Sequence, residues 1–177
     1  MEQATYPGDD IIPDAEMVYN QTRIINASAA DIFPCVVQLG KGRGGWYLPS
    51  RWERMLPKSW VASRVIDPTF QLLKTGDRVP DYGTRDDYFD VVSIDTPRSL
   101  VYESLRFGTK FTWAILLHET ESATGVSTVV HLRFRGKIAS TGLRRGVIVW
   151  LGGILDHITT APMLAGLAER VERGHID

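Results

Sequence analysis

The amino-acid sequence predicts an α+β fold in which a long C-terminal helix lies across a curved antiparallel sheet. Two observations carry this prediction. Between Trp60 and Ile138, short β-rich stretches alternate with turn residues, and such short connections make neighbouring strands antiparallel. Over residues 147–173 the apolar side chains follow the helical period, and the apolar side of so long a helix needs a broad partner such as a sheet.

The composition is that of a globular protein with one core. The chain has 177 residues, of which 44% are hydrophobic and 23% charged. Its 20 basic and 21 acidic residues leave a net charge of −1, and no region is strongly basic, so we predict no nucleic-acid partner. The single cysteine, Cys35, excludes an internal disulfide and favours a reducing, cytoplasmic location.

The C-terminal apolar stretch raises the alternative of a membrane span. Residues 147–167 have the necessary length, but five residues that disfavour a span interrupt them: Asp156, His157, Thr159, Thr160 and Pro162. We therefore favour a buried or pocket-lining helix and predict no stable membrane insertion. A homodimer is left open.

The first third of the chain predicts a strand followed by two short helices. Residues 1–14 are acidic and contain two prolines, so we expect a flexible arm, followed by a single domain over residues 15–177. Residues 15–26 are β-rich. Ser28 and Asp31 form a helix-start pattern for a helix that ends before Gly40, and residues 51–56 favour a second helix. The aromatic residues nearby favour a mini-core or the lip of a pocket: Trp46, Tyr47, Trp52 and Trp60.

The middle of the chain predicts the remaining strands of a sheet of about seven. They cover residues 62–66, 77–79, 87–95, 99–106, 110–119 and 127–138. Because opposed residues in a hairpin share a face, three pairings define a register: Ile94 with Val101, Leu105 with Phe111, and Leu117 with Val130. The resulting apolar face holds Tyr88, Asp90, Val92, Ile94, Val101, Glu103, Leu105, Phe111, Trp113, Ile115, Leu117, Val130, Leu132 and Phe134.

Two carboxylates, Asp90 and Glu103, fall on this apolar face. An unpaired buried carboxylate costs several kcal/mol or has a raised pKa, so each must meet a wet pocket, meet a partner or be protonated. We identify both as candidate catalytic acids or bases, with a solvated position at the sheet edge as the alternative. The candidate ligand-binding residues are Tyr88, Val92, Val101, Trp113, Ile115, Leu132 and Phe134 on the strands, and Leu151, Leu155, Asp156 and Thr159 on the long helix. No metal-ligand spacing occurs, so we predict no metal and no cofactor.

Several segments, taken in order, resemble the START-like, or Bet v 1-like, superfamily, also called SRPBCC. They are residues 29–40, 44–47 with 52–54, 76–77, 111–113 and 163–170. Within the superfamily the chain looks like the bacterial polyketide cyclase/dehydrase-like group. The resemblance implies a helix-grip fold, in which a seven-stranded sheet wraps the C-terminal helix around a hydrophobic cavity.

These observations lead to two functional hypotheses. The first is a binding protein for a small hydrophobic molecule, such as a polyketide, a terpenoid or a lipid-like metabolite. The second is a cyclase, dehydratase or isomerase acting on such a molecule, with Glu103 or Asp90 as general acid or base. The superfamily hosts several unrelated functions, so the fold alone does not choose between them.

Overall fold

A six-stranded antiparallel sheet forms the centre of the computed structural model, which describes residues 5–82, 87–106, 109–122, 125–137 and 160–173. The strand order is β1-β6-β5-β4-β3-β2. The strands are β1 (Met17–Ile25), β2 (Arg78–Pro80), β3 (Tyr88–Asp95), β4 (Ser99–Arg106), β5 (Thr109–Ser122) and β6 (Gly125–Lys137). The helices are α1 (Ala29–Val37), α2 (Ser50–Glu53) and a C-terminal helical segment over residues 160–172, with short 3-10 helices η1 (Asp9–Ile11), η2 (Lys58–Trp60) and η3 (Pro68–Phe70). The predicted α+β class is confirmed.

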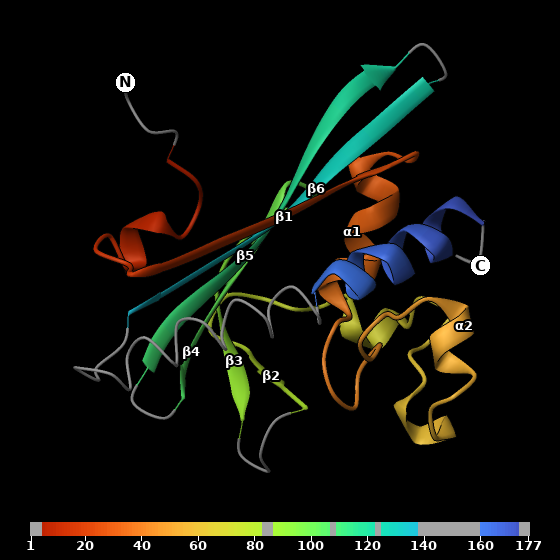
Figure 1. Cartoon of the computed structure of the whole chain (residues 1–177), viewed down its shortest axis with the longest axis horizontal. Coiled ribbons are helices and arrows are strands. Elements are labelled where there is room, and N and C mark those ends of the chain that lie inside the picture. Colours follow the sequence, from red (N-terminus) through yellow and green to blue (C-terminus); the bar gives the residue numbers. More distant parts are fainter. Residues whose placement is uncertain (1–4, 83–86, 107–108, 123–124, 138–159, 174–177) are drawn as a thin grey trace.

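The sheet has two differently covered faces (Figure 1). The inner face carries the main core, against which α1 and the 160–172 segment pack. Its side chains include Phe89, Val91, Leu100, Tyr102, Phe111, Trp113, Ile115, Leu132 and Phe134. The outer face carries a second, smaller cluster of Val101, Ala114 and Leu116.

The N-terminal segment covers part of the outer face. Tyr6 and Ile11 pack on the small cluster, and the Asp9 carboxylate accepts a hydrogen bond from Arg133 Nε at 2.7 Å. Arg135 donates to the Ile12 carbonyl at 2.8 Å. This part of the predicted N-terminal arm therefore packs on the sheet.

The predicted register is correct for β5–β6 and wrong for the two preceding hairpins. Leu117 pairs with Val130 as expected. Leu105 pairs with Lys110 instead of Phe111, and Ile94 pairs with Leu100 instead of Val101. A register shift between Val91 and Ser93 changes the pairing again within β3. The one-residue slip at β4–β5 moves the odd-numbered β4 residues to the outer face.

The strand predicted over residues 62–66 is also wrong, because this segment has no strand in the described structure. Its backbone acceptors are used by a side chain instead: Arg170 donates to the carbonyls of Ala62 at 3.5 Å and Ser63 at 3.3 Å. The described sheet therefore has six strands, one fewer than expected. Of the helix predicted over residues 147–173, residues 147–159 lie outside the described residues.

Local contacts explain how the helices are anchored. The Ser28 hydroxyl accepts a hydrogen bond from the Asp31 amide at 3.1 Å, which confirms the predicted helix start. The Tyr47 hydroxyl donates to the carbonyl of Cys35 in α1 at 2.9 Å. On the 160–172 segment, Gly166 lies so close to Leu48 that an added Cβ would meet its backbone at 2.6 Å. This close approach brings the C-terminal segment against the chain leading into α2.

Candidate functional site

Trp113 lies at the centre of an aromatic cluster on the inner face. Its ring stacks on Trp46 at 5.2 Å between centroids and on Tyr102 at 5.9 Å. Phe89 contacts it at 5.8 Å. Alternation along β5 turns Trp113 inward, while Trp46 arrives from the glycine-rich loop that follows α1. The cluster consists of large, rigid apolar rings, which are the side chains that most often line sites for planar organic molecules.

The structure divides the sequence-predicted residues between the two faces. Trp113, Ile115, Leu132 and Phe134 lie on the inner face with the main core. Register with Thr112 or Ala114 places Asp90, Glu103 and Val101 on the outer face, Tyr88 shares that face with Asp90 by alternation along β3, and Val92 packs on the outer cluster. Leu151, Leu155, Asp156 and Thr159 lie outside the described residues.

Both candidate carboxylates on the outer face form ion pairs. Glu103 lies 3.2 Å from Lys110 Nζ, and Asp90 accepts a hydrogen bond from Arg78 Nε at 3.0 Å. Their side chains keep 35% and 40% of their surface exposed. The expectation that they share a face with Trp113 is wrong, because the β4–β5 register differs by one residue. Their catalytic role stays a prediction.

The sequence reasoning missed the polar group that does lie on the inner face, the hydroxyl of Tyr102. Tyr102 is 1% exposed, and no described residue partners its hydroxyl. Burial raises the pKa of this phenol, although the charge of Arg43 opposes the shift, so the hydroxyl is protonated at neutral pH. An unpartnered buried hydroxyl is costly, which makes this group a ready donor to an acceptor oxygen.

Arg43 comes from the glycine-rich loop and is held by backbone acceptors. Its Nη2 donates to the carbonyls of Val37 and Phe70, each at 3.1 Å. Its buried Nε has no partner among the described residues. A fixed cation with one free donor near Tyr102 favours oxygen atoms of a ligand. In the sequence, Arg43 is a single arginine among glycines, and this pattern matches no specific binding motif.

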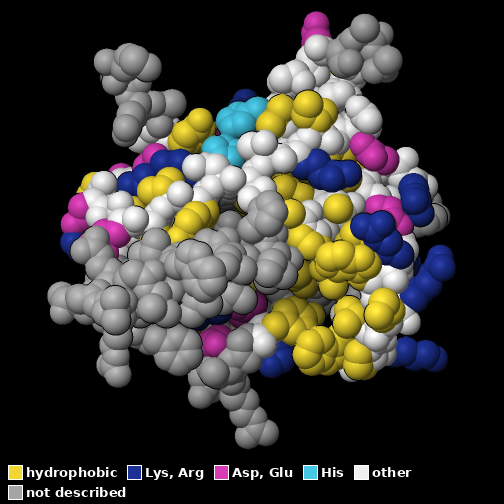
Figure 2. All heavy atoms as spheres, viewed as in Figure 1, with side chains coloured by type: hydrophobic (Ala, Val, Ile, Leu, Met, Phe, Trp, Pro, Cys, Tyr) yellow, Lys and Arg dark blue, Asp and Glu magenta, His cyan; other side chains and the backbone are white. Residues whose placement is uncertain are grey.

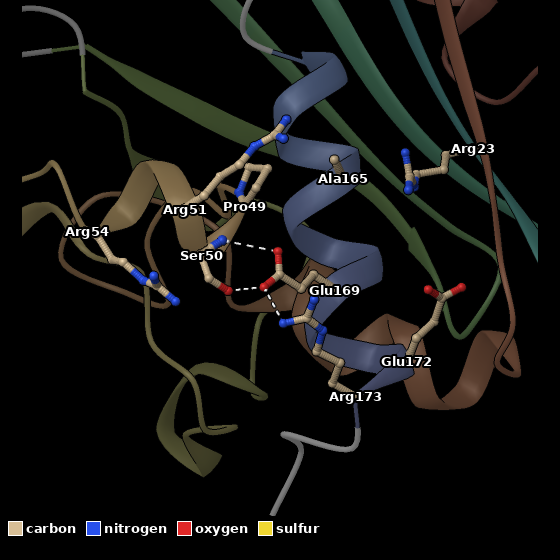
Figure 3. A pocket seen from close by; sticks show the side chains of 9 residues that line it. All are labelled: Arg23, Pro49, Ser50, Arg51, Arg54, Ala165, Glu169, Glu172 and Arg173. Carbon is tan, nitrogen blue, oxygen red and sulfur yellow. Dashed lines mark hydrogen bonds and ion pairs between the residues drawn. The ribbon is translucent and has the colours of Figure 1, made fainter.

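A separate groove of about 450 Å³ lies between α2, β1 and the 160–172 segment (Figure 3). It is lined by Arg23, Pro49, Ser50, Arg51, Arg54, Ala165, Glu169, Glu172 and Arg173. Both glutamates are already engaged: Glu169 accepts from the Ser50 amide at 3.1 Å, and Glu172 accepts from the Asn26 amide at 3.0 Å. Four arginines and two glutamates line the groove, so its net charge is positive.

Comparisons with known proteins find structural similarity without close sequence similarity. No family model and no curated protein matches the chain. DynU16, a protein in the dynemicin biosynthetic locus, is similar with 15% identity and a TM-score of 0.50; the match covers 90% of this chain and 48% of that one. The chain shares its overall fold with this protein, and the predicted helix-grip architecture is confirmed.

Two further solved structures are similar with lower TM-scores. Protein MLL2253 from Mesorhizobium loti is 15% identical with a TM-score of 0.49, and the match covers 88% of this chain and 97% of that one. Major latex-like protein 151 from Panax ginseng is 11% identical with a TM-score of 0.42, covering 90% and 97%. At these identities the likeness concerns the fold alone. Within the described residues, no helix combines the length and apolar composition that crossing a bilayer requires.

Proposed function

We propose that the protein binds a small hydrophobic molecule against the inner face of the sheet. The observation that carries the proposal is the Trp113 cluster, a set of stacked rings next to a buried, unpartnered hydroxyl. Covering about 100 Å² of apolar surface on each ring contributes roughly 2.5 kcal/mol, so three rings contribute about 7.5 kcal/mol, which corresponds to a Kd of a few micromolar before the cost of association.

Tyr102 and Arg43 give the proposed ligand a polar end. Both side chains offer a buried donor that no described residue accepts. A carbonyl, phenol or carboxylate oxygen would accept these donors, whereas a pure hydrocarbon would leave them unpaired. The proposal therefore favours an oxygenated ring system over an unsubstituted alkane.

A neutral fluorescent probe, N-phenyl-1-naphthylamine, tests the binding proposal. Phe134 is only partly buried and stacks on Phe111 at 5.2 Å, so Phe134→Ala removes inner-face surface. We expect about a tenfold weaker probe affinity, the equivalent of roughly 1.4 kcal/mol. Ile24→Ala, an exposed β1 control, should leave the affinity unchanged. Equal probe binding by both variants, or none by the wild type, would contradict the proposal.

A cyclase, dehydratase or isomerase is the second candidate function, and the Tyr102 hydroxyl is the observation that favours it. A protonated donor in an apolar site can polarise a substrate carbonyl and stabilise charge that develops on its oxygen. This role differs from the general acid/base role predicted for Asp90 and Glu103. Turnover that Tyr102→Phe abolishes and Glu103→Gln leaves intact would support it.

A cytoplasmic location is proposed from the single cysteine, whose buried thiol suits a reducing compartment. The proposed partner is the small ligand itself. A homodimer stays open, and sedimentation analysis would settle the assembly state.

A further inference from the structure

The segment over residues 50–65 combines exposed large apolar side chains with exposed cations. Trp52, Met55 and Trp60 are 43%, 85% and 58% exposed. Val61 and Val65 are 37% and 56% exposed. We call these five side chains, with the basic residues among them, the 50–65 patch. Figure 2 shows hydrophobic side chains gathered on one part of the surface, with Lys and Arg side chains at its margin.

The charge of the patch has one sign at the surface. Its sequence holds one acidic residue, Glu53, and that side chain is turned inward, where it pairs with Arg170 at 2.5 Å and Arg64 at 2.8 Å. Arg51, Arg54 and Lys58 are exposed, and none of them forms an ion pair with a residue in the described part of the chain. The surface that remains is apolar and positive.

The cationic groove continues this surface. Arg51 and Arg54 belong both to the patch and to the groove lining, where Arg23 and Arg173 join them. A second hollow of about 400 Å³ shares Ser50 and Arg54 with the groove and extends to Val61 and Arg64. A phosphate-sized anion in these hollows would therefore meet several guanidinium groups, and the exposed Trp52 follows Arg51 directly in the sequence.

We propose that this surface docks the protein on membranes that contain anionic phospholipid. The lipid phosphates bind in the groove, and Trp52, Met55 and Trp60 enter the interfacial layer. Tryptophan prefers the boundary between headgroups and acyl chains, and basic residues are attracted to anionic lipid. An acidic protein could pair with the arginines, but it would not explain why two tryptophans and a methionine are exposed in the same patch. Docking of this kind is reversible and needs no membrane-spanning helix.

Vesicle flotation of the whole chain tests the proposal. We expect binding to vesicles of phosphatidylcholine with phosphatidylglycerol and little binding to phosphatidylcholine alone, with a loss of binding at high salt. The double variant Arg51→Glu with Arg54→Glu should bind at least about 25-fold more weakly, because each basic residue near an anionic surface contributes roughly fivefold. Arg98→Glu, an exposed control on the β3–β4 connection, should change binding little.

Bromine-labelled lipids test the position of the tryptophans. Bromolipid quenching should be much weaker in Trp52→Phe with Trp60→Phe than in the wild type, because the double variant keeps only Trp46, Trp113 and Trp150 as emitters. Equal binding to neutral and anionic vesicles, unaltered binding of the arginine variant, or binding only to acidic soluble proteins would overturn the proposal. The naphthylamine assay contains no vesicles, so a failure of ligand binding and a failure of membrane docking are separately visible.

Discussion

Arg170 and Glu53 form a buried ion pair that joins the C-terminal segment to α2. Arg170 Nη2 lies 2.5 Å from Glu53 Oε1, and the two side chains are 4% and 3% exposed. Arg170 also donates to the carbonyls of Leu48 and Gly166, each at 3.3 Å, and its guanidinium lies 4.6 Å from the centre of the Tyr47 ring. One side chain thus joins the C-terminal segment to residues 47–53, which are distant in sequence.

Glu53→Gln should lower the free energy of unfolding by about 3–5 kcal/mol, because it leaves the Arg170 charge buried without its counterion. Urea unfolding measures the change. Arg64→Gln removes the exposed partner of the same carboxylate and should cost less than about 1 kcal/mol. Similar losses for both variants would show that burial does not control the strength of this pair.

Tyr102→Phe should stabilise the ligand-free protein by about 1–3 kcal/mol, because it removes a buried hydroxyl without a partner. Tyr47→Phe is the matched control: its hydroxyl accepts from Gln38 and donates to the Cys35 carbonyl, so its removal should destabilise the protein. Thermal unfolding compares the two. The proposed function adds that Tyr102→Phe weakens binding of a ketone ligand more than that of its hydrocarbon analogue.

Gly166→Ala should destabilise the fold by more than about 2 kcal/mol, although alanine normally favours a helix by about 1 kcal/mol over glycine. The added methyl would meet the Leu48 backbone at 2.6 Å, and backbone cannot turn away as a side chain can. Gly42→Ala has no atom within 4 Å and suffers only from its positive φ of 71°, at a cost of about 1–2 kcal/mol. A neutral Gly166→Ala would argue against this close contact.

Asp9→Asn should lower stability at neutral pH and have little effect in acid. Burial acts to raise the pKa of Asp9, but the hydrogen bond and charge of Arg133, the Tyr6 amide and the charge of Arg135 outweigh it, so the pKa is lowered. A carboxylate with a lowered folded pKa contributes stability above its unfolded value of about 3.9, and this contribution is lost as the pH falls through the folded pKa.

Unfolding curves of wild type and Asp9→Asn at a series of pH values measure this effect. The two curves should differ most above about pH 5 and converge as the pH falls from the unfolded value of about 3.9 through the lowered folded pKa. Asp95→Asn removes an exposed pair with Arg98 and should change stability by less than about 1 kcal/mol at any pH. A difference that grows as the pH falls would contradict the sign of the Asp9 effect.

The sequence predicts the sheet well where one face is buried against the helices. Along β5 and β6, Trp113 and Ile115 face Phe134 and Leu132 as expected. It fails at β4 because four consecutive residues from Ser99 to Tyr102 are buried. The N-terminal segment covers the outer face there, so both faces are apolar and alternation no longer identifies the inner one.

The candidate site was accordingly half predictable. Trp113 was found because the β5–β6 register is as predicted, whereas the apolar face predicted from the sequence does not include Tyr102. The shift around Val92 compounded the error, since one extra residue within a strand exchanges its faces. The cationic groove is lined by Arg23, Arg51 and Arg173, which come from three distant segments of the chain. No local sequence pattern predicts that these three side chains lie together.

The buried position of Cys35 makes the rate of its alkylation a measure of local opening around α1. Burial raises the pKa of this thiol to about 11, so an alkylating reagent finds almost no thiolate and no access while α1 stays closed under Tyr47. Because the chain has one cysteine, every modified molecule records an opening at that corner. The alkylation rate of Cys35 therefore reports how often α1 opens when the surrounding contacts of Tyr47 and Arg170 break.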